Sequence, residues 1–153
     1  MATTTGRIRR QRRDEGVAAW AALLRGQATV VRRLEAHLAA AKGLPLSWYD
    51  VLLELEHAPD RRLRMQELGN RAVLSRSRVS RVVDELVTEG LVRREPDPTD
   101  RRGSYATLTP AGRARMRRAA PAYVRGIDEN FTRHLTQDEL AAIHTACLRL
   151  AEA

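Results

Sequence analysis

Residues 74–86 have the sequence LSRSRVSRVVDEL, in which apolar residues recur among arginines and serines. The apolar members have helical spacing, which predicts a short helix with one buried side; they are Val79, Val82, Val83 and Leu86. The opposite side of a helical wheel and its flanks carry Ser77, Arg78, Ser80, Arg81 and Asp84. Arginine can donate two hydrogen bonds to guanine and serine can bond phosphate or base edges. This side is therefore suited to nucleic acid, and an ordinary solvated surface is the alternative interpretation.

The segments before this helix complete a helix-turn-helix pattern. Residues 47–57 are predicted to form one amphipathic helix, and residues 64–71 are predicted to form a second, shorter one. Val73 and Leu74 then supply a tight turn, and Ser75 is a favourable N-cap for the helix that follows. A short helix, a turn and a second helix with a polar outer side are typical of DNA-binding proteins.

A β-hairpin is predicted directly after the helix-turn-helix. Residues 91–94 and 104–108 favour strands, and the nine residues between them contain two prolines, three aspartates or glutamates and a glycine. Such a hairpin lies beside bound DNA and can place an arginine in a narrow minor groove. A mobile loop with scattered charges is the alternative interpretation of its tip.

Long helices are predicted on both sides of this core. The sequence therefore predicts a mainly α protein with a small β wing, a winged helix-turn-helix with N- and C-terminal helices. Residues 1–13 are expected to be a disordered basic arm, and residues 14–153 a single domain. Within it, the core spans about 47–109 and the flanking helices about 14–41 and 110–152.

The chain has 153 residues and a formal net charge of +8, which favours an acidic partner such as DNA, with a membrane surface as the alternative. The start of the chain lacks a signal peptide and no stretch is apolar enough to span a membrane, so we expect a cytoplasmic protein. Neither a catalytic motif nor metal-ligand spacing is present. We therefore expect no enzyme activity, no metal and no cofactor.

Five segments together resemble the MarR family of transcriptional regulators. They are LRMQEL (63–68), VSRVVDEL (79–86), GLVRR (90–94), DRR (100–102) and LTPAG (108–112). Their order and spacing both fit the family. Two positions depart from it: Arg64 stands where a serine or threonine often starts the helix, and Gly69 replaces a common alanine.

The resemblance implies a homodimer in which the first helix and the last two form the dimerisation domain. The two lobes would bind a pseudo-palindromic operator in double-stranded DNA. Ser75 to Arg81 would contact bases and phosphates, and Arg102 would reach the minor groove with Asp100 holding it. The expected DNA-binding residues are Arg64, Ser75, Arg76, Ser77, Arg78, Ser80, Arg81, Arg94, Asp100, Arg101 and Arg102. We expect Arg81 to govern sequence choice, and Arg64 or Arg94 to govern general affinity.

Many family members are repressors that release DNA when a small, often aromatic or phenolic, ligand binds between the two regions. Polar-tipped aromatic residues are the candidate ligand contacts, with a role in the core or interface as the alternative. They are Trp20, His37, Trp48, Tyr49 and His57.

Three other functions remain open at this point. The first is a constitutive or architectural DNA-binding protein without an effector, and the second is a protein-interaction module on the same scaffold. The third is a redox sensor that uses Cys147, the single cysteine. Because Cys147 lies on an apolar stripe of the last predicted helix, we expect it to be buried and unreactive.

Overall fold

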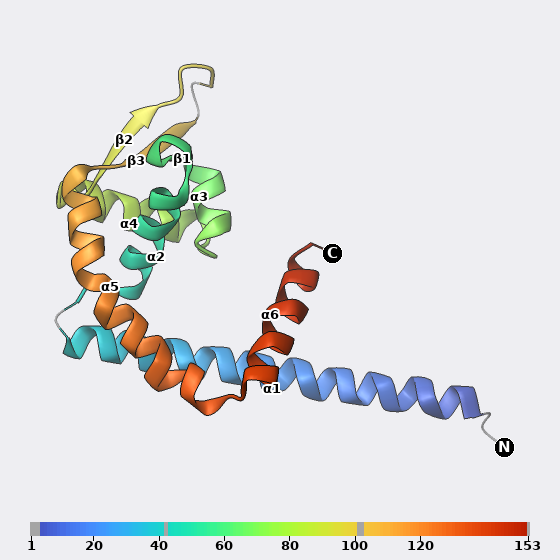
Figure 1. Ribbon diagram of the computed structural model, residues 1–153. Coiled ribbons are helices and arrows are strands. Elements are labelled where there is room, and N and C mark those ends of the chain that lie inside the picture. The colour runs from blue at the N-terminus through green and yellow to red at the C-terminus, as the bar shows by residue number, and fades with distance from the viewer. Residues whose placement is uncertain (1–3, 42, 101–102, 153) are drawn as a thin grey trace.

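The computed structural model describes residues 4–41, 43–100 and 103–152, with side chains from residue 9 onward. It confirms a mainly helical chain with a small antiparallel sheet (Figure 1). The helices are α1 (Thr4–Ala40), α2 (Leu46–His57), α3 (Met65–Arg71), α4 (Arg76–Thr88), α5 (Pro110–Asn130) and α6 (Gln137–Ala151), with short 3-10 turns η1 (Pro59–Arg61) and η2 (Thr132–His134). The strands are β1 (Arg62–Arg64), β2 (Val92–Pro96) and β3 (Ser104–Leu108). Within the described ranges, no helix is both long and apolar enough to cross a membrane.

Helix α1 begins at Thr4, well before the predicted start near Asp14. The expectation of a disordered arm is therefore wrong for residues 4–13. Arginine, which supplies five of these ten residues, is a good helix former, and the first proline in the chain is Pro45. The side chain of Gln11 also donates a hydrogen bond of 3.0 Å to Glu15 one turn later.

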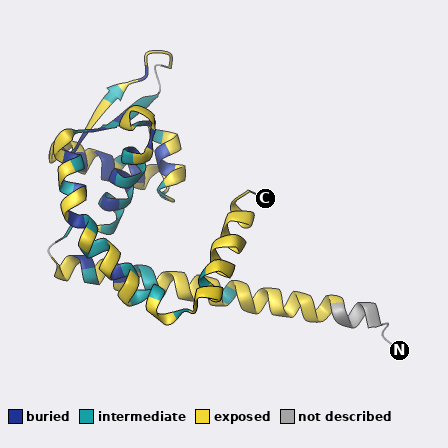
Figure 2. Ribbon diagram, viewed as in Figure 1, coloured by how far each residue is buried: buried dark blue, intermediate teal, exposed yellow. Residues whose placement is uncertain are grey.

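The buried core lies in the lobe formed by α2, α3, α4 and the sheet (Figure 2). The four apolar residues of α4 are buried as predicted, and Leu52, Leu55 and Leu68 pack with them without exposure. Burial of this stripe fixes which side of α4 faces solvent. The amphipathic repeat therefore places the Arg- and Ser-bearing side on the surface.

The sheet contains one strand more than the sequence indicated. Strand β1 pairs with β3, and β3 pairs with β2, all antiparallel. Arg64 is opposite Tyr105 in this register and precedes α3 rather than starting it. Helix α2 also differs, since it begins at Leu46 after Pro45 and shows no side-chain cap from Ser47.

The LTPAG segment joins the wing to α5 through two local contacts. The hydroxyl of Thr109 donates to the Gly90 carbonyl at 2.8 Å and accepts from the Gly112 amide at 3.0 Å. Gly112 packs so closely against the Leu91 carbonyl that a Cβ at this position would collide with backbone. The motif is therefore needed to seat the start of α5 on the lobe.

We expect Gly112→Ala to lower the free energy of unfolding by roughly 1–3 kcal/mol, because the added methyl must displace backbone rather than a flexible side chain. Urea or thermal unfolding measures the change. The matched control is Gly16→Ala in α1, where a Cβ meets nothing within 4 Å. That variant is expected to be as stable as the wild type or slightly more stable. Equal destabilisation by both changes would contradict the argument.

Helices α1 and α5 pack against each other below the lobe, whereas α6 has no buried residue. Nδ1 of His37 in α1 lies 3.2 Å from Oε2 of Glu129 in α5 at this contact. The sulfur-bearing side chain of Cys147 is exposed in this chain, contrary to the expectation of burial. The reason is that α6 stands away from the body, as Figures 1 and 2 show.

Candidate nucleic-acid interface

Helix α4 presents three arginines to solvent. Its N-cap is Ser75, whose hydroxyl accepts a hydrogen bond of 3.3 Å from the Arg78 amide. Arg76, Arg78 and Arg81 are exposed, and none of their guanidinium groups has an ion pair or hydrogen bond within the described part of the chain. These three charges are therefore available to an external anion or base edge.

Arg94, a residue of the wing strand β2, contacts α4 with its side chain. Its guanidinium lies 2.6 Å from Asp84 Oδ1 and donates to Ser80 Oγ at 3.1 Å. Glu85, another acidic residue of α4, accepts a hydrogen bond of 2.8 Å from the Trp48 indole. Helix α4 is thus tied to both the wing and α2, and its acidic residues leave Arg78 unpaired.

Arg64 reaches from the end of β1 into the wing. Its Nη2 lies 2.7 Å from Asp97 Oδ2 and 3.3 Å from Thr99 Oγ1, while Nε donates to the Tyr105 hydroxyl at 3.1 Å. The hydrogen bond to Tyr105, followed by the charge of Asp97, raises the pKa of the Arg64 guanidinium. Nothing in the structure tests its expected phosphate contact, which stays a prediction.

Asp97 is a functional candidate that the sequence analysis missed. Its Oδ1 accepts hydrogen bonds of 2.8 Å from both the backbone amide and the hydroxyl of Thr99. These bonds, the backbone one first, and then Arg64 lower the pKa of Asp97 despite its burial. An aspartate two residues before a threonine is a signal for such a turn and could have identified it.

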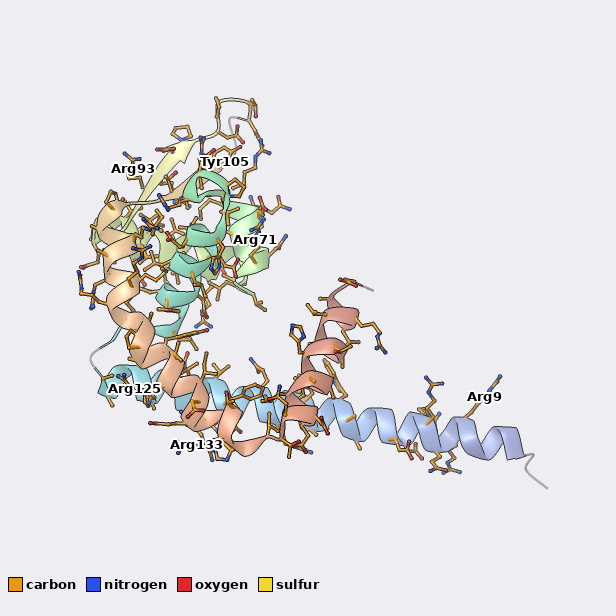
Figure 3. All side chains as sticks on the ribbon, viewed as in Figure 1. Arg9, Arg71, Arg93, Tyr105, Arg125 and Arg133 are labelled. Carbon is orange, nitrogen blue, oxygen red and sulfur yellow. The ribbon has the colours of Figure 1, made fainter. Side chains whose placement is uncertain are left out.

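A groove of about 560 Å³ lies between α3, α4 and the base of the wing. Most of its polar lining can donate hydrogen bonds, which fits a phosphate backbone. The lining includes Arg64, Gln66, Asn70, Arg76, Ser80, Arg94 and Ser104. Figure 3 labels Arg93 and Tyr105 on the wing and Arg71 on α3, all three on the lobe.

The tip of the wing is described only in part. Arg101 and Arg102 lie outside the described residues, so their expected DNA contacts stay predictions. At the base of the tip, the Asp97 amide donates to the Gly103 carbonyl at 3.1 Å and the Gly103 amide donates to the Asp100 carbonyl at 2.9 Å. These bonds link the two arms of the wing at the base of its tip.

The five predicted ligand residues do not gather around one cavity. His37 pairs with Glu129, Trp48 bonds Glu85, and Tyr49 stacks on Tyr123 with ring centroids 4.0 Å apart. The remaining two are exposed, Trp20 on α1 and His57 at the end of α2.

A separate hollow of about 370 Å³ lies between α1, α2, α5 and the turn before α4. Its charged lining is mixed, with three carboxylates and two guanidinium groups. These belong to Glu35, Asp50, Glu54, Arg71 and Arg78, and Tyr123 lies beside them. Because Arg71 is already paired with Glu67 at 2.6 Å, the unpaired charge of the hollow is mainly negative.

Asp50, which lines this hollow, has a raised pKa. Burial, and then the nearby charge of Glu54, raise its pKa to about 6. The same environment raises the pKa of Tyr123 to about 12, first by burial and then by the charge of Asp50. The folded protein therefore holds a proton on Asp50 at a pH where the unfolded chain has released it.

The contribution of Asp50 to the free energy of unfolding therefore falls as the pH rises from about 4 to about 6, by less than roughly 3 kcal/mol because solvent screens this partly exposed group. We expect Asp50→Asn, which cannot ionise, to be more stable than the wild type at pH 7.5. At pH 4 the two proteins should be equally stable. Thermal unfolding across this range measures the effect, and a constant difference at all pH values would contradict it.

Comparison with known proteins places this architecture in a family. A family model described as MarR family matches residues 42–103. A MarR family transcriptional regulator of Streptomyces coelicolor, Sco3205, solved in complex with DNA, is 33% identical, and the match covers 90% of this chain and 87% of that one with a TM-score of 0.78. The chain belongs to the MarR family.

Two further matches are to transcriptional regulators. AbsC, a MarR family regulator from the same organism, is 31% identical over 91% of this chain and 93% of its own, with a TM-score of 0.76. The repressor YetL of Bacillus subtilis is 28% identical over 63% of this chain. That match spans 59% of YetL, so the chain covers only part of the length of this curated relative.

Among the described residues, no group of three or more histidines, cysteines, aspartates or glutamates could hold a metal ion.

Proposed function

We propose that this protein is a homodimeric transcriptional regulator that binds a pseudo-palindromic operator and represses transcription from it. The observation that carries the proposal is the exposed side of α4, where Arg76, Arg78 and Arg81 have no acidic partner in the described chain. In Sco3205, a relative of the same fold, the protein was solved in complex with DNA. The cytoplasm is the proposed compartment, because bacterial operator DNA lies there.

The flanking helices support the proposal of a homodimer. Large apolar side chains are exposed on the first half of α1 and along α6, although neither surface packs on the lobe. They are Val17, Trp20, Leu23, Leu24, Ile143, Leu148 and Leu150. Large apolar side chains exposed along two helices are typical of an interface, and a second copy would supply the same residues.

We further propose that a small ligand relieves repression by binding in the hollow between α1, α2 and α5. This hollow joins the proposed dimerisation helices to the turn before α4, so an occupant can bias the spacing of the two lobes. Its lining favours a ligand with a positive charge over a phenolate, since three carboxylates line it and Arg71, one of its two arginines, is already paired with Glu67. Ligand-dependent loss of operator binding would test this part.

Selection from random double-stranded DNA with the purified protein tests the proposed function. We expect enrichment of an inverted repeat whose half-site centres lie about 10 bp apart, and binding that weakens steeply with salt. Retention without a motif would instead indicate an architectural DNA-binding protein. No retention at low salt would favour a protein-interaction module and contradict the proposal.

A further inference from the structure

Among the residues that the structure describes, Asp97 is the one charged residue that is buried, with 5% of its surface exposed. It follows β2 directly and therefore lies where the wing leaves the sheet. Burial of a carboxylate is unfavourable unless it is paired and hydrogen-bonded. Asp97 meets both conditions, through Thr99 in its own loop and Arg64 outside the wing loop.

Arg64 joins three parts of the lobe with one guanidinium. It ends β1 and directly precedes α3, and it contacts Asp97 after β2 and Tyr105 on β3. Its planar group can satisfy both partners at once because the donors are fixed in a fork. The start of α3 is therefore linked to both arms of the wing. The side chain of Arg64 makes one link, and the β1–β3 pairing makes the other.

We propose that Asp97 and Arg64 are positioning residues that set the orientation of the wing relative to α4. This inference rests on the proposed contact of the wing tip with the minor groove. A hairpin is free to swing about its base, and a small rotation there moves the tip by much more than the base. Correct placement at the base lets α4 and the tip contact DNA at the same time.

We call the ion pair between Arg64 and Asp97 the brace. It also changes the interpretation of Arg64, for which the sequence suggested a phosphate contact. A guanidinium 2.7 Å from a buried carboxylate has its charge largely compensated. Its main contribution to DNA binding is then the geometry of the wing. The two roles differ in a testable way, because a phosphate contact acts independently of the wing tip, whereas a brace acts through it.

The decisive variant is Asp97→Asn. An amide has a single acceptor oxygen, so either the Thr99 donors or the Arg64 guanidinium must face an NH2 group. The change also removes a negative charge beside the DNA, and electrostatics alone would strengthen binding. The brace predicts the opposite sign, with affinity for the selected operator roughly tenfold to 100-fold weaker.

Fluorescence anisotropy with the selected duplex measures this affinity, and thermal unfolding confirms that each variant is folded at the assay temperature. The matched control is Glu95→Gln, which removes the same charge from the same wing at a half-buried position. The control is expected to bind as tightly as the wild type or more tightly. Binding of Asp97→Asn as tight as that of the control would overturn the proposal.

A double-mutant cycle with Arg102→Ala separates positioning from simple destabilisation. If the brace acts through the tip, Asp97→Asn and Arg64→Gln lose most of their effect when Arg102 is already alanine. Full effects of both in that background would overturn the brace and restore a direct contact for Arg64. If Arg102→Ala binds like the wild type, the proposed minor-groove contact is wrong, and the brace is then judged by the sign of the Asp97→Asn effect.

Discussion

Arg81→Ala is expected to remove most of the preference for the operator over unrelated DNA. Arg81 lies on the side of α4 opposite the buried valines, is exposed, and has no partner among the described side chains. One bidentate contact with guanine contributes about 1–3 kcal/mol of discrimination. With two half-sites in a dimer, we expect the ratio of the two dissociation constants to fall by roughly 30-fold to 20,000-fold.

The measurement compares the selected operator with a scrambled duplex of the same length at one salt concentration. Arg133→Ala is the control, because it removes the same charge at an exposed position in η2, beside Asp128 and far from α4 (Figure 3). That variant should keep the full ratio. If Arg81→Ala instead weakens binding to both duplexes equally, Arg81 contacts phosphate and another residue reads the sequence.

Local patterns explain what the sequence predicted correctly in this lobe. The burial of Val79, Val82 and Val83 follows from helical periodicity within one short segment, so no distant contact was needed. The caps by Ser75 and Thr109 likewise depend only on neighbours three residues away. The surface of α4, which carries the candidate interface, could therefore be derived from the sequence.

Contacts between distant segments explain what the sequence could not predict. Strand β1 exists because Arg62–Arg64 pairs with residues more than forty positions later, which no local repeat records. The ion pair between Arg64 and Asp97 depends on that pairing, as does the new interpretation of Arg64. The extent of α1 was missed for another reason, since residues 4–13 contain one large apolar residue, Ile8, and so lack the apolar stripe that marks a helix.

Leu148→Asp is expected to convert the protein to monomers and to remove high-affinity operator binding. Leu148 is 51% exposed on α6 and is one of the apolar residues that we assign to the dimer interface. A symmetric interface would bury two copies of the new carboxylate, each without a partner, at a cost of roughly 3–5 kcal/mol or more. A monomer can contact only one half-site, so affinity should fall at least 100-fold.

Analytical ultracentrifugation at micromolar concentration measures the oligomeric state, and anisotropy measures operator binding. The control is Ala114→Asp, which introduces the same charge at an exposed position of α5 outside the apolar surface. It is expected to remain dimeric. The core of the lobe does not include α6, so circular dichroism should still report a folded lobe for Leu148→Asp. A dimer of this variant with wild-type affinity would show that α6 lies outside the interface, and the apolar residues of α1 would then have to account for dimerisation alone.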